Sequence, residues 1–118
     1  MKAPSKRTLR VAELIQRKLA QLIQVECKDP RLPSWITISA VDVSADFSYA
    51  KIYFTVLQSD PQQALNALNA ASSFLRSQLA KTLTIRIVPQ LVFVHDESLE
   101  YGRKMRAIID NANQSHEE

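Results

Sequence analysis

Glycine is almost absent from this chain of 118 residues, where only Gly102 occurs. A phosphate-binding or dinucleotide-binding loop needs several glycines for the backbone to approach the phosphates, so both kinds of loop are excluded. Cys27 is the single cysteine, which excludes an intrachain disulfide and any Cys-x-x-Cys metal or redox motif. The two histidines, His95 and His116, are too few for a histidine-rich metal site.

Long apolar segments are missing too. No run approaches the roughly 18–20 residues that a membrane span needs, and the basic N-terminus is not followed by the apolar region of a signal peptide. The apolar content of 46% and the charged content of 23% are typical of a globular domain. We therefore expect a soluble intracellular protein with one domain, residues 1–118, and not an enzyme.

Positive charge is concentrated at the N-terminus. Residues 1–31 carry eight basic and three acidic side chains, a net charge of +5, whereas the rest of the chain has seven basic and nine acidic ones. Over residues 5–26 the apolar positions recur at helical spacing, which predicts one long amphipathic helix with a largely basic outer face. Pro30 and Pro33 follow this segment and cannot continue the helix.

Two β-type runs come next, at residues 35–41 and 50–56, and the turn-like link between them predicts a hairpin. The first run places Ile36, Ile38 and Ala40 on one face. The second alternates as well, and its expected buried residues are Ala50, Ile52, Phe54 and Val56.

A second helix is predicted from Asp60, its N-cap, with Pro61 at the first helical position, to about Lys81. Small residues at 70–73 predict a kink or break within it. A third strand follows at 85–94, where Pro89 indicates an edge or a bulge. A last helix is expected at 98–111, capped by Ser98, before a frayed tail at about 112–118.

The predicted order is α-β-β-α-(kink)-α-β plus a C-terminal helix. Such an order is typical of an α+β domain with a small three-stranded mixed sheet and helices on one face. It is also the element order of a type II KH-like domain.

The residues carry a closer resemblance, which spans roughly residues 9–109. The chain resembles the ribosome-binding factor A family, bacterial assembly factors of the small ribosomal subunit. The segments that carry it are Arg10-Val11, Lys28-Asp29-Pro30-Arg31, Val43-Ser44-Ala45-Asp46, Tyr49-Ala50-Lys51-Ile52, Phe74-Leu75-Arg76-Ser77, Ile85-Arg86-Ile87-Val88-Pro89 with Leu91 and Phe93, and Asp96-Glu97-Ser98-Leu99 with Gly102. The family has an Ala-x-Gly kink, and the equivalent here, Ala71-Ser72-Ser73, has serine in place of the glycine.

The resemblance implies a non-catalytic protein that binds free or immature 30S subunits. It implies contact with 16S rRNA, near the 5′-terminal helix, and support of late subunit maturation and 16S rRNA processing. It further implies a cytoplasmic monomer with no cofactor and with neither a membrane nor DNA as partner. The alternative is a KH-like protein-interaction module that docks an acidic protein. A hydrolase built on His95, Asp96 and Ser98 is not favoured, because adjacency in sequence supplies neither a placed base nor an oxyanion site.

The candidate RNA-binding residues are mostly cations, which neutralise phosphates and release counterions. They are Lys6, Arg7, Arg10, Arg17, Arg31, Lys51, Ser72, Ser73, Arg76, Lys81, Arg86, Arg103 and Lys104. The basic helix face has two interpretations, RNA contact or simple solvation of an amphipathic helix. Arg76 has two as well: it binds a phosphate at a helix N-terminus past the kink, or forms a salt bridge with Asp46 or Asp96. Tyr53 either stacks a base or is a half-buried strand tyrosine.

Overall fold

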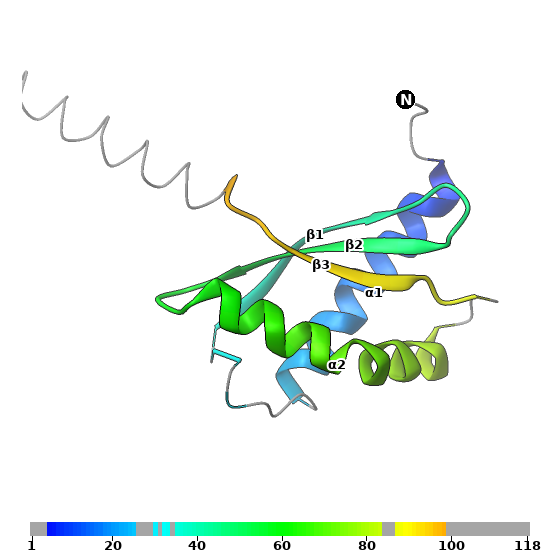
Figure 1. The fold of residues 1–118 in the computed structure, drawn as a ribbon. Helices are drawn as coiled ribbons and strands as arrows, with labels where there is room; N and C mark the ends of the chain where they lie inside the picture. The colour runs from blue at the N-terminus through cyan, green and yellow to red at the C-terminus, as the bar shows by residue number, and fades with distance from the viewer. Residues whose placement is uncertain (1–4, 26–29, 31, 34, 84–86, 99–118) are drawn as a thin grey trace, which may run out of the picture.

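The computed structural model describes residues 5–25, 30, 32–33, 35–83 and 87–98 and has the predicted α+β architecture (Figure 1). Its elements are α1 (Lys6–Val25), β1 (Ile36–Val43), β2 (Tyr49–Val56), α2 (Pro61–Thr82) and β3 (Gln90–His95). The expected last helix and tail lie outside the described residues, and so do the candidates Arg31, Arg86, Arg103 and Lys104.

The sheet has the order β1-β2-β3 and is mixed, as expected. β1 and β2 form the predicted antiparallel hairpin, whereas β3 pairs parallel to β2, from Tyr49 opposite Gln90 to Phe54 opposite His95. Parallel neighbours need a long crossover, and the segment containing α2 supplies it. Pro89 comes directly before the edge strand β3, where its missing N–H costs no ladder hydrogen bond.

The expectation for Ala40 is wrong. The register of β1 against β2 shifts between Ile38 and Ala40, so Ser39 forms a bulge. An extra residue in one strand sends every later side chain to the opposite face. Beyond the bulge Val43 is therefore buried, while Ala40 is exposed.

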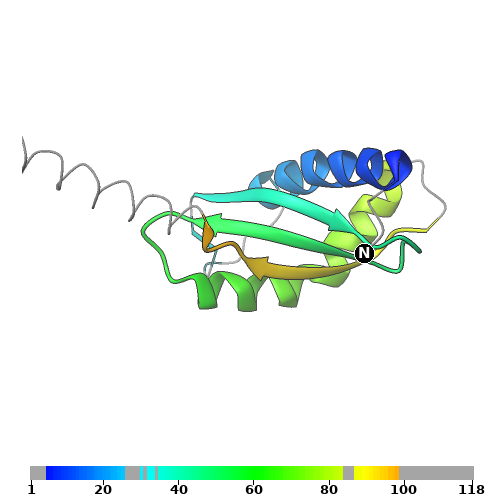
Figure 2. The same cartoon turned by 90° about the horizontal axis from the view of Figure 1, so that it is seen from above.

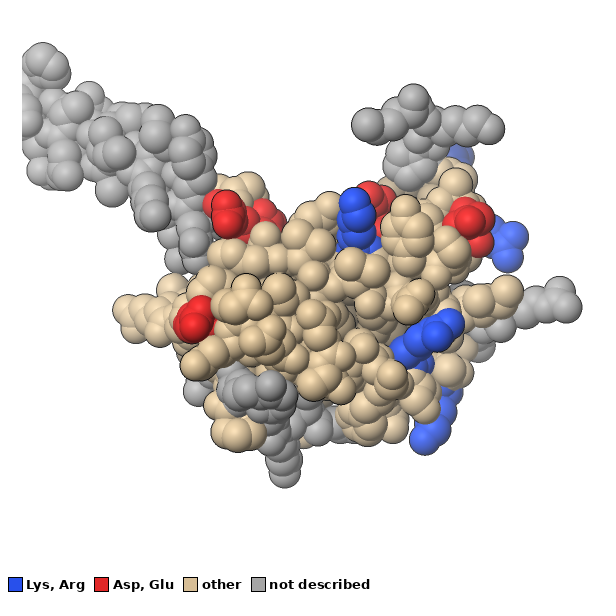
Figure 3. Space-filling view, viewed as in Figure 1, with Lys and Arg blue, Asp and Glu red and all other residues tan. Residues whose placement is uncertain are grey.

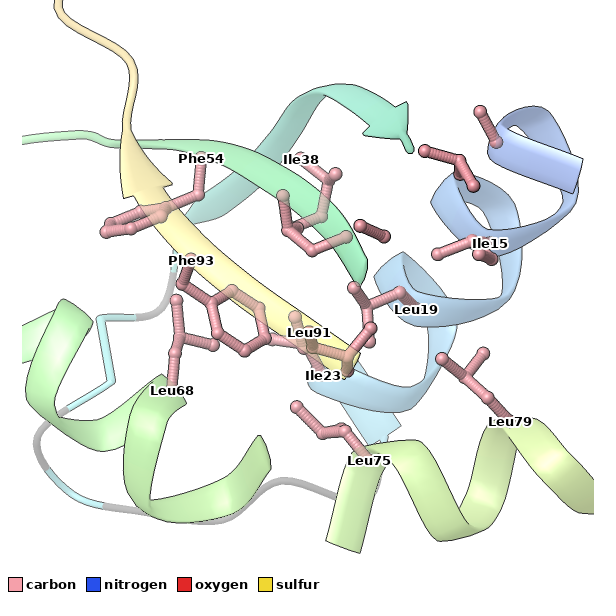
Figure 4. Packing of buried hydrophobic residues seen from close by; sticks show 14 of the residues in the cluster. Ile15, Leu19, Ile23, Ile38, Phe54, Leu68, Leu75, Leu79, Leu91 and Phe93 are labelled. Carbon is pink, nitrogen blue, oxygen red and sulfur yellow. The ribbon is translucent and has the colours of Figure 1, made fainter. Parts of the chain in front are cut away.

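The core lies between one face of the sheet and the two helices. Ala50, Ile52 and Phe54 of β2 are fully buried, and Val56 is nearly so, as the alternation predicts. α1 packs along β1 and α2 along β3 (Figure 2). The leucine and isoleucine side chains of both helices meet the sheet in one cluster, in which Figure 4 shows Ile15, Leu19, Leu68, Leu75, Leu79, Phe54 and Phe93.

Both helices begin with a side-chain cap. The Ser5 hydroxyl accepts a hydrogen bond from the Thr8 N–H at 3.1 Å. The Asp60 carboxylate accepts one from the Gln62 N–H at 2.9 Å, with Pro61 at the first helical position, so the predicted start of α2 is confirmed. These bonds satisfy backbone donors that have no partner within the helix.

α2 is one unbroken helix of 22 residues, so the sequence-predicted irregularity at 70–73 is not a break. The ribbon of α2 nevertheless changes direction near its middle in both views (Figures 1 and 2). At this place the Ser72 hydroxyl donates to the Asn69 carbonyl at 2.9 Å. Back-bonding of this kind bends a helix without interrupting it.

Candidate nucleic-acid interface

Charge is divided between the two layers of the fold. Among the described residues, α1 and α2 together carry seven Lys or Arg side chains and one acid, Glu13. The described residues of the strands and their connections carry one cation, Lys51, and five acids. The seven helical cations are Lys6, Arg7, Arg10, Arg17, Lys18, Arg76 and Lys81; the five acids are Asp42, Asp46, Asp60, Asp96 and Glu97.

The outward face of α1 displays its cations because the opposite face is anchored in the core. Ile15 and Leu19 are fully buried, and the period of 3.6 residues then turns Lys6, Arg10 and Arg17 to solvent. Arg10 follows Lys6 by four residues and Arg17 follows Arg10 by seven, so the three cations lie on one exposed stripe of the helix. The stripe gives a phosphate backbone a row of charges to follow.

Arg7 has a further contact. Its guanidinium lies over the ring of Phe47 in the β1–β2 turn, 5.4 Å from the ring centroid. Such cation–π contacts stabilise by roughly 0.5–1 kcal/mol at exposed sites. The contact places the N-terminus of α1 beside the hairpin turn.

Arg76 lies toward the same end of the molecule. Its Nε and Nη2 donate to the Val88 carbonyl at 3.2 and 3.0 Å, and the nearby Gln90 N–H donates to Ser48 in the hairpin turn. Figure 3 shows Lys and Arg side chains in the middle and at the end where α1 begins, with Asp or Glu beside them, whereas the charged side chains at the opposite end of this face are all Asp or Glu.

Arg76 therefore follows neither of the two expected interpretations fully. The salt bridge is not formed, because Asp46 bonds to Ser44 and Ser48, and Asp96 to other serines. Two of the five guanidinium N–H donors bind Val88, and the exposed side chain leaves the others able to reach a partner outside the protein. Phosphate contact by Arg76 stays a prediction.

The prediction of a phosphate site at a helix N-terminus past the kink is wrong, because no helix begins there. α2 continues through residues 70–73, so the N–H groups there belong to the interior of a helix and bond within it. Ser72 is half-buried with its hydroxyl turned to Asn69, while Ser73 is exposed. Of these two serines, Ser73 is the one that can offer its hydroxyl to RNA without giving up that bond.

Lys51 is separated from the other candidates. It is exposed between the buried Ala50 and Ile52, so it points away from both helices, and its cross-strand neighbour is Asp42. Tyr53, on the same side of β2, is half-buried. The structure thus places Lys51 on the acidic layer and not with the helical cations.

Hydrogen bonds lower the pKa of two acids in the sheet layer, Asp46 and Asp96. Bonds from the Ser48 hydroxyl and N–H and from the Ser44 hydroxyl lower the pKa of Asp46 from 3.8 to about 2. Bonds from Ser98 and then Ser39 lower the pKa of Asp96. Donors to a carboxylate favour its ionised form. Both carboxylates therefore stay ionised to a lower pH than an ordinary aspartate, and at neutral pH their charge disfavours a phosphate backbone on the sheet side.

The sequence missed a hollow that the packing of the helices creates. It has a volume of about 200 Å³ and is lined by Lys18, Gln21, Leu22, Val25 and Thr82. Helical spacing within α1 offered no signal for it, because Thr82 comes from the end of α2 and reaches α1 only in the folded chain. Lys18 is half-buried here, and was not among the candidates.

The described part of the chain holds no group of three or more His, Cys, Asp and Glu side chains that could bind a metal ion. In the same residues no helix is long and apolar enough to span a membrane.

Comparisons with known proteins converge on one family. Residues 7–109 match the family described as ribosome-binding factor A. Ribosome-binding factor A of Legionella pneumophila strain Philadelphia 1 is 57% identical over 108 residues, which cover 92% of this chain and 88% of that protein. The Methylobacillus flagellatus protein of the same name is 49% identical over 106 residues, covering 90% of this chain and 84% of the relative.

Solved structures agree. The crystal structure of ribosome-binding factor A from Thermus thermophilus superposes with a TM-score of 0.71 at 31% identity, covering 77% of this chain and 97% of that one. A homology model of the Thermus thermophilus factor, fitted into the cryo-electron microscopy map of a 30S complex, gives a TM-score of 0.62 at 32% identity, covering 73% and 91%. The sequence match and the shared fold together show that this chain belongs to the ribosome-binding factor A family.

Proposed function

We propose that this protein is a non-catalytic assembly factor that binds free or immature 30S subunits and contacts 16S rRNA through its helix layer. The observation that carries the proposal is the division of charge, with seven cations and one acid on the described helices. The 30S complex of the Thermus thermophilus relative supports the choice of the small subunit as partner. The protein acts in the cytoplasm as a monomer, supporting late maturation and 16S rRNA processing in the region of the 5′-terminal helix.

The physical basis is counterion release. Each phosphate that a Lys or Arg neutralises sets free part of a condensed counterion, so affinity falls with salt. If Lys6, Arg10, Arg17, Arg76 and Lys81 each contact one phosphate, the slope of log affinity against log salt is about −4. No bond is made or broken in such a complex, because the protein acts by occupying RNA.

Co-sedimentation tests the proposal. Purified protein is spun with free small subunits and with joined ribosomes, at low and at high salt. We expect binding to the free subunit only, with a steep loss as salt rises. Equal binding to both particles, or binding that does not weaken as salt rises, would contradict the role of an assembly factor that binds through phosphate contacts.

The alternative partner, an acidic protein, suits the same cationic layer. Nuclease digestion of the isolated complex separates the two. An RNA complex is lost when the RNA is degraded, whereas a complex with an acidic protein survives. Survival of the complex would show that the direct contact is a protein and not rRNA.

A further inference from the structure

The hollow between the C-terminal ends of α1 and α2 has the size of a single ring system. Its volume of about 200 Å³ is below the roughly 300 Å³ at which pockets for whole small molecules begin. Two apolar side chains, Leu22 and Val25, and three polar ones line it. Val25 is 69% exposed, so a flat apolar ring that covered it would remove apolar surface from water.

The polar lining matches the edge of a nucleobase. Gln21 carries both a donor and an acceptor on one amide group, which is what a base edge presents in return. The Thr82 hydroxyl is held by its bonds to the Gln78 and Leu79 carbonyls, both 3.3 Å long, so its oxygen is fixed at the rim. Lys18 brings a cation, which suits a phosphate rather than a base.

Among the residues that the structure describes, the two helical segments that form the hollow carry no acidic side chain. Lys81 precedes Thr82, and no acid occurs in α2 or in residues 14–25 of α1. Gln21 also follows Arg17 by four residues, one helical turn along the outward face. A strand that tracks the cations of α1 passes Glu13 between Arg10 and Arg17, and from Arg17 to the hollow it meets no acid among the described residues.

We propose that this hollow receives one unpaired nucleobase of the bound RNA. Gln21 bonds its Watson–Crick edge, Leu22 and Val25 contact its flat face, and Lys18 and Lys81 bind the flanking phosphates. Single-stranded RNA is recognised in this way, by splayed bases that are stacked and hydrogen-bonded at their edges. The inference rests on the proposed function. It adds a contact with one particular base to a surface that otherwise recognises RNA only by its charge.

Chemical probing of the Watson–Crick edges in 16S rRNA tests the inference, using free small subunits with and without the full-length protein. We expect at least one single-stranded base to be protected by the wild type. The Gln21→Ala variant loses this protection, keeps the others, and binds the subunit about fivefold more weakly, as the loss of one or two hydrogen bonds predicts. Gln24→Ala is the matched control, because Gln24 is exposed on the same helix but does not line the hollow; it keeps every protection.

The charge part of the inference has its own test. Lys18→Gln lowers the steepness of the salt dependence by about one unit of slope, as the loss of one phosphate contact requires. If Gln21→Ala retains all protections and full affinity, the hollow does not hold a base, although subunit binding by the wild type would still uphold the proposed function. A wild type that fails to co-sediment with the subunit would overturn both.

Discussion

The Ser39 hydroxyl donates a 2.7 Å hydrogen bond to Asp96 Oδ2, which links the bulge of β1 to the residue that follows β3. β2 lies between the two, and the Asp96 N–H donates to the Phe54 carbonyl of this central strand at 2.8 Å. The bulge is what turns Ser39 toward this end of the sheet. One side-chain pair therefore ties both edges of the sheet together.

We expect Ser39→Ala to lower the melting temperature, because Asp96 loses a donor and the two edge strands lose their connection. Ser77→Ala, at an exposed serine of α2, is the control and leaves the melting temperature unchanged or slightly raised, because alanine is the better helix former. Thermal unfolding followed by circular dichroism measures both. Equal melting temperatures for the two variants would show that the link does not stabilise the sheet.

Acid should weaken the fold within a defined pH window. The pKa of Asp46 is lowered from 3.8 to about 2, so its contribution is complete above the unfolded value and is lost as the pH falls through the folded one. The lowered pKa of Asp96 acts in the same direction. We expect the melting temperature to fall between about pH 4 and pH 2. The fall becomes shallower in Asp46→Asn, and a profile identical to that of the wild type would contradict a role for the turn carboxylate.

The layer that binds RNA can be identified by matched charge reversals. Arg10→Glu, Arg17→Glu and Lys81→Glu each remove a helical cation, and each should reduce 30S affinity and the salt slope. Lys51→Glu makes the same charge change on the opposite layer and should have little effect. Co-sedimentation at several salt concentrations gives both quantities. A loss with Lys51→Glu as large as with Arg10→Glu would mean that the sheet side faces the RNA.

Arg76 should prove to be a structural residue, whatever its role toward RNA. Arg76→Ala leaves the carbonyl of the buried Val88 without its two donors, at a cost of roughly 1–3 kcal/mol in the free energy of unfolding. Arg10→Ala changes an exposed arginine on the outward stripe of α1 and stays within about 0.5 kcal/mol of the wild type. Urea unfolding compares the two. For this reason Arg76 is a poor choice for a binding test by charge reversal.

Ser73 occupies the helix interior, where the family pattern has glycine. Because α2 is continuous at this position, Ser73→Gly should destabilise the protein by about 0.5 kcal/mol and Ser73→Ala should stabilise it by a similar amount. Denaturant titration of both variants measures the difference. A stabilising glycine would indicate that the bend of α2 needs a backbone conformation that serine resists.

Local periodicity in the sequence was sufficient to predict the elements in which buried residues recur at a regular spacing. The stripe of Ile15 and Leu19 predicted the basic outer face of α1, the alternation from Ala50 to Val56 predicted β2, and Asp60 with Pro61 predicted the start of α2. These features depend on residues a few positions apart, so their physical causes can be identified along the chain.

Contacts between distant residues were decided only by the folded structure. The bulge at Ser39 depends on the register of β1 against β2. The hydrogen bonds from Arg76 to Val88 depend on where the chain returns from α2 to the sheet. The sequence showed that the N-terminus is basic, but not that the sheet layer is acidic or that Lys51 lies on it. It could not place Lys18 beside Thr82, since residues 64 positions apart meet only when both helices pack on the same face of the sheet. Spacing along the chain determines which face of an element is buried, whereas the assembly of the layers determines which exposed residues share a surface.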